Sequence, residues 1–279
     1  MKIAGVVVLY NPTEDVLDNI ESYLCDIDRL YIIDNSIESH QNMFKDSKIT
    51  YIPLMQNKGI AYALNEGAKH AIEDSFEYLL TMDQDSSFKD HGVRRMIDFI
   101  ERDNEKSTVG IYSPFHKTAI SGEIPIEEVS SPLVVMTSGN IINLSIYEKI
   151  NGFKDWMFID CVDFDFGLNL RTNGYTIKQL NHIILHHELG NYEIKKFFNK
   201  KVFCDNHSAL RRYYIVRNSF YLYDMYHDQF PDYCNAIVKE VKNSFFYATI
   251  FEKNGFKKLI FMIRGYKDYK KGIKGKYPR

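Results

Sequence analysis

The sequence lacks the features of a disulfide framework, a structural zinc site or a membrane span. Its four cysteines are far apart and form no C-x-x-C pair, a pattern that suits a reducing compartment. It has no apolar run of the roughly 18 residues that a transmembrane helix needs. The opening "MKIAGVVVLYNP" reaches a turn too early for a secretory signal. We therefore expect a cytoplasmic protein.

Glycine-rich phosphate-binding loops are also absent. Neither G-x-G-x-x-G after the first apolar run nor G-x-x-x-x-G-K-[ST] occurs in the sequence. These loops hold phosphates with their backbone amides, so a dinucleotide fingerprint and a P-loop are both excluded. If the protein binds phosphate, another group must neutralise the negative charge.

Strand and helix signals alternate through the first half of the chain. Apolar, β-rich runs at 3–10, 30–36, 49–54 and 76–82 each end in polar turn residues. Apolar residues at helical spacing predict a helix after Pro12, capped by Thr13, and another over 57–74 that begins just after Gly59. With 279 residues and 45% hydrophobic content, the chain can bury a large core. The pattern predicts an α/β fold with a mostly parallel sheet.

Aspartates follow two of the predicted strands. Asp34 ends the second strand, and Asp83 and Asp85 follow the fourth in "LLTMDQDSSF". The carboxyl ends of parallel strands share the edge where open α/β sheets bind ligands. Two carboxylates can bind a diphosphate through Mg²⁺ or Mn²⁺, because the cation offsets the negative charge of the carboxylates and of the diphosphate. The alternative, in which this D-x-D only hydrogen-bonds a local turn, stays open at this point.

A second acidic cluster lies in "WMFIDCVDFDFGLNLRTNGY". Asp160, Asp163 and Asp165 stand among aromatic residues just before a predicted helix that ends at Gly174. Burial would raise the pKa of such a carboxylate and favour its use as a general base, although each could instead cap the helix. The next strand ends in a histidine pair, of which one imidazole is a candidate metal ligand or a solvated side chain. The residues of this pair are His186 and His187. The segment 134–153 before the cluster predicts a strand, a turn, a short strand and a helix.

Several motifs together resemble a known family. "VVVLYNP", "YIIDNS", "NKGIAYALNEG", "LLTMDQDSSF", "TSGNIINLSIYEKINGF", "FIDCVDFDFGLNLRTNGY", "HHELG" and "RRYYIVRNSFYL" occur in this order within residues 1–220. They resemble the inverting family 2 glycosyltransferases, and within them the bacterial rhamnosyltransferases. The resemblance implies a GT-A catalytic domain over 1–202, with a nucleotide-binding half at about 1–115 and an acceptor half at about 116–202. Residues 203–279 form a helical, aromatic and basic region beyond it.

The resemblance also implies roles for individual residues. Asp163 falls on the position of the catalytic base, and Asp83, Asp85 and His187 on those of metal ligands for Mg²⁺ or Mn²⁺. The residues implied in nucleotide-sugar binding are Tyr10, Asp34, Asn57, Gly59, Asn65, Asp83, Gln84, Asp85, Arg212 and Arg217. Phe166 and Asn169 stand where relatives often carry Trp and Arg, so the acceptor contacts depart from the family pattern.

The resemblance makes dTDP-L-rhamnose the first expectation for the donor, with UDP-linked hexoses as the alternative. The acceptor would be a glycan of a cell-surface polysaccharide, built on a lipid carrier. Three rival functions are a glycoside hydrolase, a metal-dependent phosphatase or nucleotidyltransferase, and a non-catalytic binder of nucleotide sugars. The transferase is favoured because it uses Asp34, the D-x-D pair, the second acidic cluster and the histidine together.

The tail is electrostatically distinct. Residues 253–279 contain ten Lys or Arg and a single acid, Asp268, in a chain whose net charge is −2. Apolar and aromatic residues between the lysines suit a helix on the anionic, inner face of the cell membrane. Alternatively, the tail packs on the catalytic domain or on a second copy in a homodimer.

Overall fold

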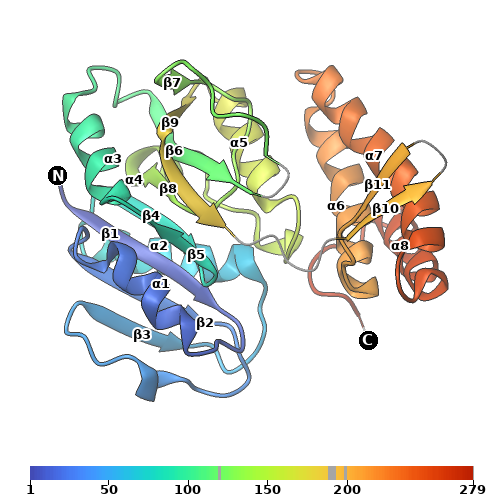
Figure 1. Cartoon of the computed structure of the whole chain (residues 1–279), viewed down its shortest axis with the longest axis horizontal. Helices are drawn as coiled ribbons and strands as arrows, with labels where there is room; N and C mark the ends of the chain where they lie inside the picture. Colours follow the sequence, from blue (N-terminus) through green and yellow to red (C-terminus); the bar gives the residue numbers. More distant parts are fainter. Residues whose placement is uncertain (119–120, 188–192, 198–199, 279) are drawn as a thin grey trace. The chain divides into compact units, whose positions relative to one another are not determined.

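The computed structural model describes residues 1–118, 121–187, 193–197 and 200–278, the side chains of 187, 196–197 and 200–203 excepted. The chain divides into two compact units (Figure 1). The α/β unit comprises Met1–Asp155 and Asp163–Glu188, and the helical unit comprises Trp156–Val162 and Leu189–Arg279. The boundary predicted after residue 202 differs from this division, because the hairpin of β10 (Glu193–Phe197) and β11 (Lys200–Cys204) groups with the helices.

One mixed sheet forms the centre of the α/β unit, in the order β3-β2-β1-β4-β8-β6-β9-β5, with β7 paired to β9. Its strands are β1 (Ile3–Leu9), β2 (Arg29–Asp34), β3 (Ile49–Pro53), β4 (Tyr78–Asp83), β5 (Ser86–Phe88), β6 (Val109–Lys117), β7 (Val129–Ser130), β8 (Asn140–Asn143) and β9 (Thr176–His187). Strands β1 to β4 are parallel, and β8 runs antiparallel to both β4 and β6. The predicted α/β class is confirmed, with parallel pairing among β1 to β4 and mixed pairing in the rest of the sheet.

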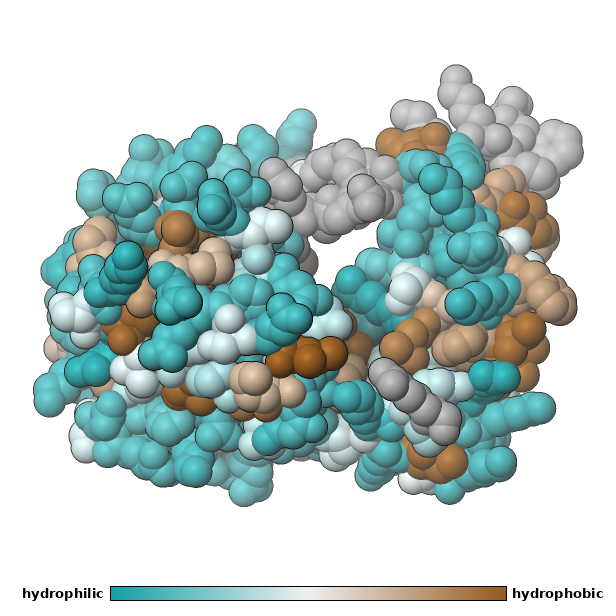
Figure 2. Space-filling view, turned by 90° about the horizontal axis from the view of Figure 1, so that it is seen from below, coloured by the Kyte–Doolittle hydropathy of each residue, from teal (hydrophilic) through white to brown (hydrophobic). Residues whose placement is uncertain are grey.

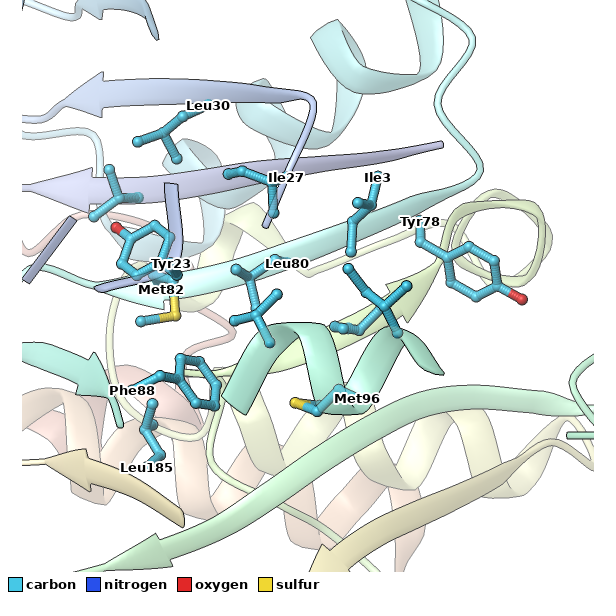
Figure 3. Close-up of a cluster of buried hydrophobic side chains, with 14 of the residues drawn as sticks. Ile3, Tyr23, Ile27, Leu30, Tyr78, Leu80, Met82, Phe88, Met96 and Leu185 are labelled. Carbon is cyan, nitrogen blue, oxygen red and sulfur yellow. The ribbon is translucent and has the colours of Figure 1, made fainter. Parts of the chain in front are cut away.

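Helices cover both faces of the parallel strands. On one face, α1 (Asp15–Leu24) and α3 (Gly92–Arg102) pack against side chains that include Val7. Figure 3 shows part of this core, with Leu80 and Met82 of β4 close to Phe88 and Met96. Successive residues of a strand face opposite sides of the sheet, so Val6 points to α2 (Ile60–Glu73) on the other face.

The contact between β1 and α2 depends on a glycine. A Cβ built on Gly67 of α2 would lie 2.2 Å from a methyl carbon of Val6. Any larger residue at 67 would therefore push α2 away from the sheet. This close approach fixes α2 over the strands whose ends carry the predicted nucleotide site.

Two local predictions were wrong. Thr13 does not cap α1, because Glu14 precedes the helix and makes no capping side-chain hydrogen bond. Residues 134–137 form no strand, because side chains bind their carbonyls: Asn140 donates to the Met136 carbonyl and Thr81 to the Thr137 carbonyl. The remaining elements of this unit are η1 (Gln41–Met43), α4 (Leu144–Lys149) and α5 (Val162–Thr172), while η2 (Asp155–Met157) falls mostly in the segment assigned to the helical unit. Helix α5 is followed, as predicted, by Gly174 in a left-handed conformation with φ +79°.

The helical unit consists of α6 (Ala209–Tyr226), α7 (Pro231–Phe251) and α8 (Gly255–Lys270) together with the β10–β11 hairpin. Helices α6 and α8 pack closely at Gly265, where a Cβ would lie 2.5 Å from the carbonyl oxygen of Tyr213. Glu252 is buried between Arg212 and Lys258 and forms an ion pair with each. Among the described residues, none of the helices combines the length and apolarity that crossing a bilayer requires.

Candidate active site

The carboxyl ends of three parallel strands meet at one edge of the α/β unit. Leu9 of β1 pairs with Asp34 of β2, and Val8 pairs with Asp83 of β4. Because these strands are parallel and in register, Tyr10, Asp34 and Asp83 leave the sheet at the same edge. This is the edge where open α/β sheets bind their ligands. The structure therefore brings these three predicted site residues together.

Asp34 is buried and hydrogen-bonded through both carboxylate oxygens. Oδ1 accepts from the Ser36 backbone N–H at 2.9 Å, while Oδ2 lies 2.5 Å from the Tyr51 hydroxyl and 2.8 Å from His40 Nδ1. Burial raises the pKa of this carboxyl, but the hydrogen bonds from Ser36, Tyr51 and His40 outweigh it and hold the pKa below its ordinary value. Asp34 is thus ionised at neutral pH. A direct contact with a nucleotide base would have to replace one of these bonds.

Asparagines shape the turn that enters α2. Asn35 Oδ1 accepts the backbone N–H of Lys58 at 2.7 Å, and the Asn35 amide nitrogen lies 3.3 Å from Asn57 Oδ1. Asn57 Oδ1 also accepts the N–H of Gly59 at 3.0 Å. Gly59 has φ +92°, which glycine adopts without strain. The turn thus presents the N-terminal end of α2, with its positive end of the helix dipole, at the carboxyl edge of the sheet.

The D-x-D turn is tied to the end of β1. The Tyr10 N–H donates to Gln84 Oε1 at 2.8 Å, and Gln84 Nε2 donates to the Tyr10 carbonyl at 3.4 Å. The Asp83 N–H donates to Ser138 Oγ at 3.0 Å, which fixes the start of the turn. Asp83 is half-buried and Asp85 is exposed. The turn is therefore held by the side chains of Gln84 and Ser138, while neither aspartate is buried in the core.

The end of β9 lies beside this turn. Strands β5 and β9 are antiparallel, and their register places His187 opposite Ser86, the residue that follows Asp85. The His187 side chain lies outside the described side chains. The neighbouring His186 has a pKa lowered by burial and by the charges of Lys89 and Lys117, so its imidazole is neutral at pH 7. The backbone thus brings the predicted third metal ligand to the D-x-D pair.

The donor set at this edge fits a hard divalent cation. Mg²⁺ and Mn²⁺ prefer oxygen ligands, and Mg²⁺ takes one or two protein carboxylates while substrate phosphates and water fill its other positions. Asp83 and Asp85 offer such carboxylates at a solvent-accessible turn. Among the described side chains, three potential ligands within 4.8 Å of one another occur at Cys25, Asp26 and His91, a group that shares no residue with the D-x-D pair.

The two aspartates in the first turn of α5 have different surroundings. Asp165 is fully buried, and its Oδ1 lies 2.6 Å from the Lys154 ammonium group. Asp163 is half-buried, and its Oδ1 accepts the N–H of Phe164 at 2.9 Å. A base must reach its substrate, so the more accessible Asp163 suits that role and Asp165 suits an internal ion pair. The sequence gives no signal that Lys154 pairs with Asp165.

Asn65 holds the segment that supports α5, a role that the sequence did not predict. Its amide nitrogen donates to the Phe153 carbonyl at 2.8 Å and to Asp155, and its oxygen accepts the Phe153 N–H at 3.0 Å and the Tyr147 hydroxyl. The Phe153 ring then packs against Phe166 of α5, with ring centroids 4.3 Å apart. Asn65 was predicted to shape the nucleotide pocket. In this structure its amide connects α2 to the helix that carries Asp163.

We expect Asn65→Ala to lower the free energy of unfolding by about 2–4 kcal/mol, because it leaves the part-buried Phe153 N–H and Tyr147 hydroxyl without partners. Urea unfolding monitored by circular dichroism measures this. Asn173→Ala is the matched control, since Asn173 is exposed just after α5 and its side chain donates to Asn169 of that helix. Equal stability of the two variants would contradict the role assigned to Asn65.

In the helical unit, Arg217 and Asn218 of α6 hold the segment that precedes α5. The Arg217 guanidinium donates to the carbonyls of Trp156 and Met157, both at 3.2 Å, and to that of Gly275 at 2.5 Å. The Asn218 amide donates to the carbonyls of residues 157, 159 and 160. Arg217 has no exposed surface. A contact with donor phosphates, as the resemblance implies, would require the guanidinium to give up these carbonyls.

Arg212 and Asp160 also form ion pairs within the helical unit. Arg212 is buried and ion-paired with Glu252 and Asp205. Asp160 has φ +64°, and its Oδ1 lies 2.9 Å from Arg211 Nε. Burial raises the pKa of the Asp160 carboxyl, although Arg211 opposes the shift. The acidic cluster of the sequence is thus split: Asp160 pairs with Arg211 of α6, whereas Asp163 lies in the first turn of α5.

Known proteins match the sequence in the region of this edge. Residues 6–122 match the family model described as "Glycosyl transferase family 2". The chain is 25% identical over 240 residues to dTDP-rhamnosyl transferase RfbF of Shigella flexneri, covering 79% of each protein. It is 30% identical over 138 residues to a poly-beta-1,6-N-acetyl-D-glucosamine synthase of Staphylococcus epidermidis, which covers 46% of this chain but 33% of the synthase.

Solved structures share the fold. GalNAc-T7, crystallised with UDP, GalNAc and Mn²⁺, aligns with a TM-score of 0.61 at 10% identity, covering 98% of this chain and 56% of its own. S. aureus TarS in complex with UDP-GlcNAc aligns with a TM-score of 0.60 at 15% identity, and the alignment covers 96% of this chain and 80% of the TarS chain. At these identities the likeness concerns the fold alone. Sequence and fold together confirm the resemblance of this chain to the family 2 glycosyltransferases.

Proposed function

We propose that the protein is an inverting, metal-dependent glycosyltransferase that uses dTDP-L-rhamnose and a glycan acceptor of a cell-surface polysaccharide. The observation that carries the proposal is the single sheet edge at which β1, β2 and β4 end with Tyr10, Asp34 and Asp83. The accessible D-x-D turn at this edge offers carboxylates that can hold a divalent metal ion, which in turn binds the diphosphate of the donor. The rhamnosyl donor is supported by the likeness to RfbF.

Each part of the edge then has a role in holding the donor. Asp83 and Asp85 would hold Mg²⁺ or Mn²⁺, with His187 as a third ligand. Asn57 and Gly59 shape the turn that enters α2. Asp34, which binds Ser36, His40 and Tyr51, would help to position the pyrimidine of the nucleotide. When bound, the metal supplies positive charge that stabilises the leaving diphosphate.

Asp163 is the proposed base. Its carboxylate takes the proton from the acceptor hydroxyl as that oxygen bonds to the anomeric carbon of the donor. The bond between this carbon and the dTDP oxygen breaks, and its electron pair leaves with dTDP. Attack occurs from the face opposite the leaving group, so a single displacement inverts the configuration. A positioned base contributes about 10² to 10⁴ in rate.

Donor turnover tests the proposal. We expect the protein with Mn²⁺ to hydrolyse dTDP-L-rhamnose slowly to dTDP and rhamnose, and faster when an acceptor is present. Release of inorganic phosphate or pyrophosphate instead would support a phosphatase or nucleotidyltransferase. Metal-independent cleavage of a nitrophenyl glycoside would support a hydrolase.

A UDP-sugar is the second candidate donor. It is favoured by the fold likeness to GalNAc-T7 and to TarS, whose structures contain UDP and UDP-GlcNAc. Thermal-shift measurements with dTDP-L-rhamnose, UDP-GlcNAc and UDP-glucose, each with Mn²⁺, distinguish the two. The rhamnosyl donor should give the largest stabilisation, because binding to the native state alone raises the melting temperature. A larger shift with a UDP-sugar would reassign the donor.

The end of α7 and the start of α8 suit contact with an anionic membrane, which would bring the enzyme to a lipid-linked acceptor. Exposed apolar side chains gather there at Phe246, Ile250, Phe256, Ile260 and Ile263. Apolar patches are visible among polar side chains on the helical unit in Figure 2. Exposed basic residues flank them at Lys253, Lys257, Arg264 and Lys267. An apolar stripe bordered by positive charge is the pattern of a helix that lies in the lipid headgroup region.

We expect the double variant Phe256→Ser with Ile260→Ser to bind vesicles of phosphatidylglycerol and phosphatidylcholine at least about tenfold more weakly, because each large side chain contributes about 1.5–3 kcal/mol when buried. Sedimentation with these vesicles measures the change. Ile126→Ser, at a 95% exposed position of the α/β unit, is the matched control. Unchanged vesicle binding by the double variant, or its conversion from dimer to monomer in analytical ultracentrifugation, would show that this surface does not meet a membrane.

A further inference from the structure

A cavity lies wholly within the helical unit. It has a volume of about 540 Å³ and is formed by the second half of α6, the first two-thirds of α7 and the second half of α8. The volume falls in the range of small-molecule sites, about 300–1,000 Å³. The cavity uses none of the residues assigned to the donor or the base. Its lining alternates aromatic rings with polar and charged side chains.

The rings of this cavity are held in place by one another. Phe220 of α6 packs edge-on against Tyr266 of α8, with ring centroids 4.9 Å apart, and stacks on Tyr269 at 5.2 Å with an interplanar angle of 23°. Tyr266 nevertheless remains 39% exposed. The Tyr266 ring is thus packed against Phe220 and still partly exposed to solvent. Such a ring is a preformed apolar surface, so little conformational entropy is lost on binding.

Hydrogen-bonding groups surround this platform. The Tyr269 hydroxyl donates to Asp224 Oδ2 at 2.7 Å, which fixes the orientation of an otherwise exposed carboxylate. Burial and this bond to Asp224 raise the pKa of Tyr269 to about 12, so the hydroxyl remains a donor at neutral pH. Asn235 of α7 adds an amide with two donors and an acceptor.

Positive charge exceeds negative charge in the lining. Lys242 of α7 and Lys270 of α8 both line the cavity, against the single carboxylate of Asp224. The Lys270 ammonium group lies 5.5 Å from the centre of the Tyr269 ring and 6.0 Å from that of Tyr266. Among the residues that the structure describes, no ion pair involves either lysine. The two ammonium groups are therefore available to a negatively charged ligand.

We propose that this cavity binds an acidic glycan through one of its sugar rings. A pyranose presents C–H groups on its faces, which pack on an aromatic ring such as Tyr266, and hydroxyls at its rim, which Asp224 and Asn235 can bind. A carboxylate or phosphate substituent on the sugar would lie at Lys242 and Lys270. The inference rests on the proposed function, since it gives the glycan acceptor a second site, built from none of the residues assigned to the donor or the base. Such a site would keep a growing chain attached between transfers by raising its effective concentration.

The test is direct binding by isothermal titration calorimetry to the full chain. The probes are a hyaluronan hexasaccharide and a galacturonic acid hexamer, with maltohexaose as the neutral counterpart of equal length. We expect at least one acidic probe to bind, and maltohexaose to bind about tenfold more weakly, since two ion pairs of about 0.5–1 kcal/mol each are missing. If neither acidic hexasaccharide binds with Kd below about 1 mM, the inference is overturned.

Variants locate the site. Tyr266→Ala should weaken binding of the acidic probe about tenfold, whereas Tyr266→Phe, which keeps the ring, should bind nearly as well as the wild type. Lys242→Gln, a change to one exposed side chain, should weaken the acidic probe about fivefold and leave maltohexaose unaffected. If Tyr266→Ala does not fold, Lys242→Gln alone tests the assignment of the site. Tyr247→Ala, an exposed tyrosine of α7 outside the cavity, is the control. Unchanged binding in Tyr266→Ala and Lys242→Gln would refute the assignment.

Donor hydrolysis in the same samples separates this inference from the proposed function. Variants of the cavity should hydrolyse dTDP-L-rhamnose at the wild-type rate, because no cavity residue is assigned to the donor. Glycan binding without any donor hydrolysis would count against the proposed function alone. Donor hydrolysis without glycan binding would count against the cavity alone.

Discussion

Asp163→Asn is expected to lower kcat by about 10²- to 10⁴-fold while leaving the affinity for the donor within about twofold of the wild type. An amide cannot accept the proton of the attacking hydroxyl, but Asn can still accept the Phe164 N–H that Asp163 Oδ1 accepts at 2.9 Å. The local fold should therefore persist. Transfer to acceptor measured by release of dTDP, together with donor titration by calorimetry, provides both quantities.

Asp165→Asn serves as the control that distinguishes a base from a structural carboxylate. Asp165 is buried against the Lys154 ammonium group, so its neutralisation should lower the melting temperature and affect activity only through folding. Asp163→Asn should melt as the wild type does. If Asp163→Asn kept more than about a tenth of wild-type kcat, or if it lost donor affinity, Asp163 would not be the base.

Asp85→Ala is expected to weaken donor binding about 100-fold in the presence of Mn²⁺ and to have almost no effect without it. Asp85 is exposed at the turn and is assigned to the metal, whose interaction with a phosphoryl oxygen contributes several kcal/mol, so its loss should weaken donor binding through the metal. Calorimetric titration of dTDP-L-rhamnose, with and without Mn²⁺, measures the difference.

Asp228→Ala is a suitable control for Asp85→Ala, because this loop aspartate of the helical unit is fully exposed and distant in sequence from the D-x-D turn. It should bind the donor as the wild type does under both conditions. An equal loss of affinity with and without Mn²⁺ in Asp85→Ala would mean that Asp85 contacts the donor directly. No loss under either condition would remove Asp85 from the site.

The sequence predicted the parallel strands of the α/β unit well, because their signals are local. Continuous apolar runs such as "IAGVVVLY" and "YLLTM" end in polar residues, and the parallel strands they predict are those observed. Parallel pairing then requires the ends of β2 and β4, with Asp34 and Asp83, to reach one edge. The location of these residues could thus be predicted without a structure.

The supporting contacts of the site could not be predicted, because they join residues far apart in sequence. Asn65 reaches Phe153 and Asp155, and Arg217 reaches Trp156 and Gly275. No periodicity marks such pairs. Motif positions alone placed both Asn65 and Arg217 at the donor, whereas in the structure their side chains bind other parts of the protein.

The most direct test of the account is the anomalous signal of manganese in crystals grown with dTDP and Mn²⁺. The account predicts one peak about 2.0–2.4 Å from carboxylate oxygens of Asp83 and Asp85 and from oxygens of the dTDP diphosphate. A diphosphate bound at this edge without metal, or manganese and nucleotide bound at a place that excludes both aspartates, would contradict it.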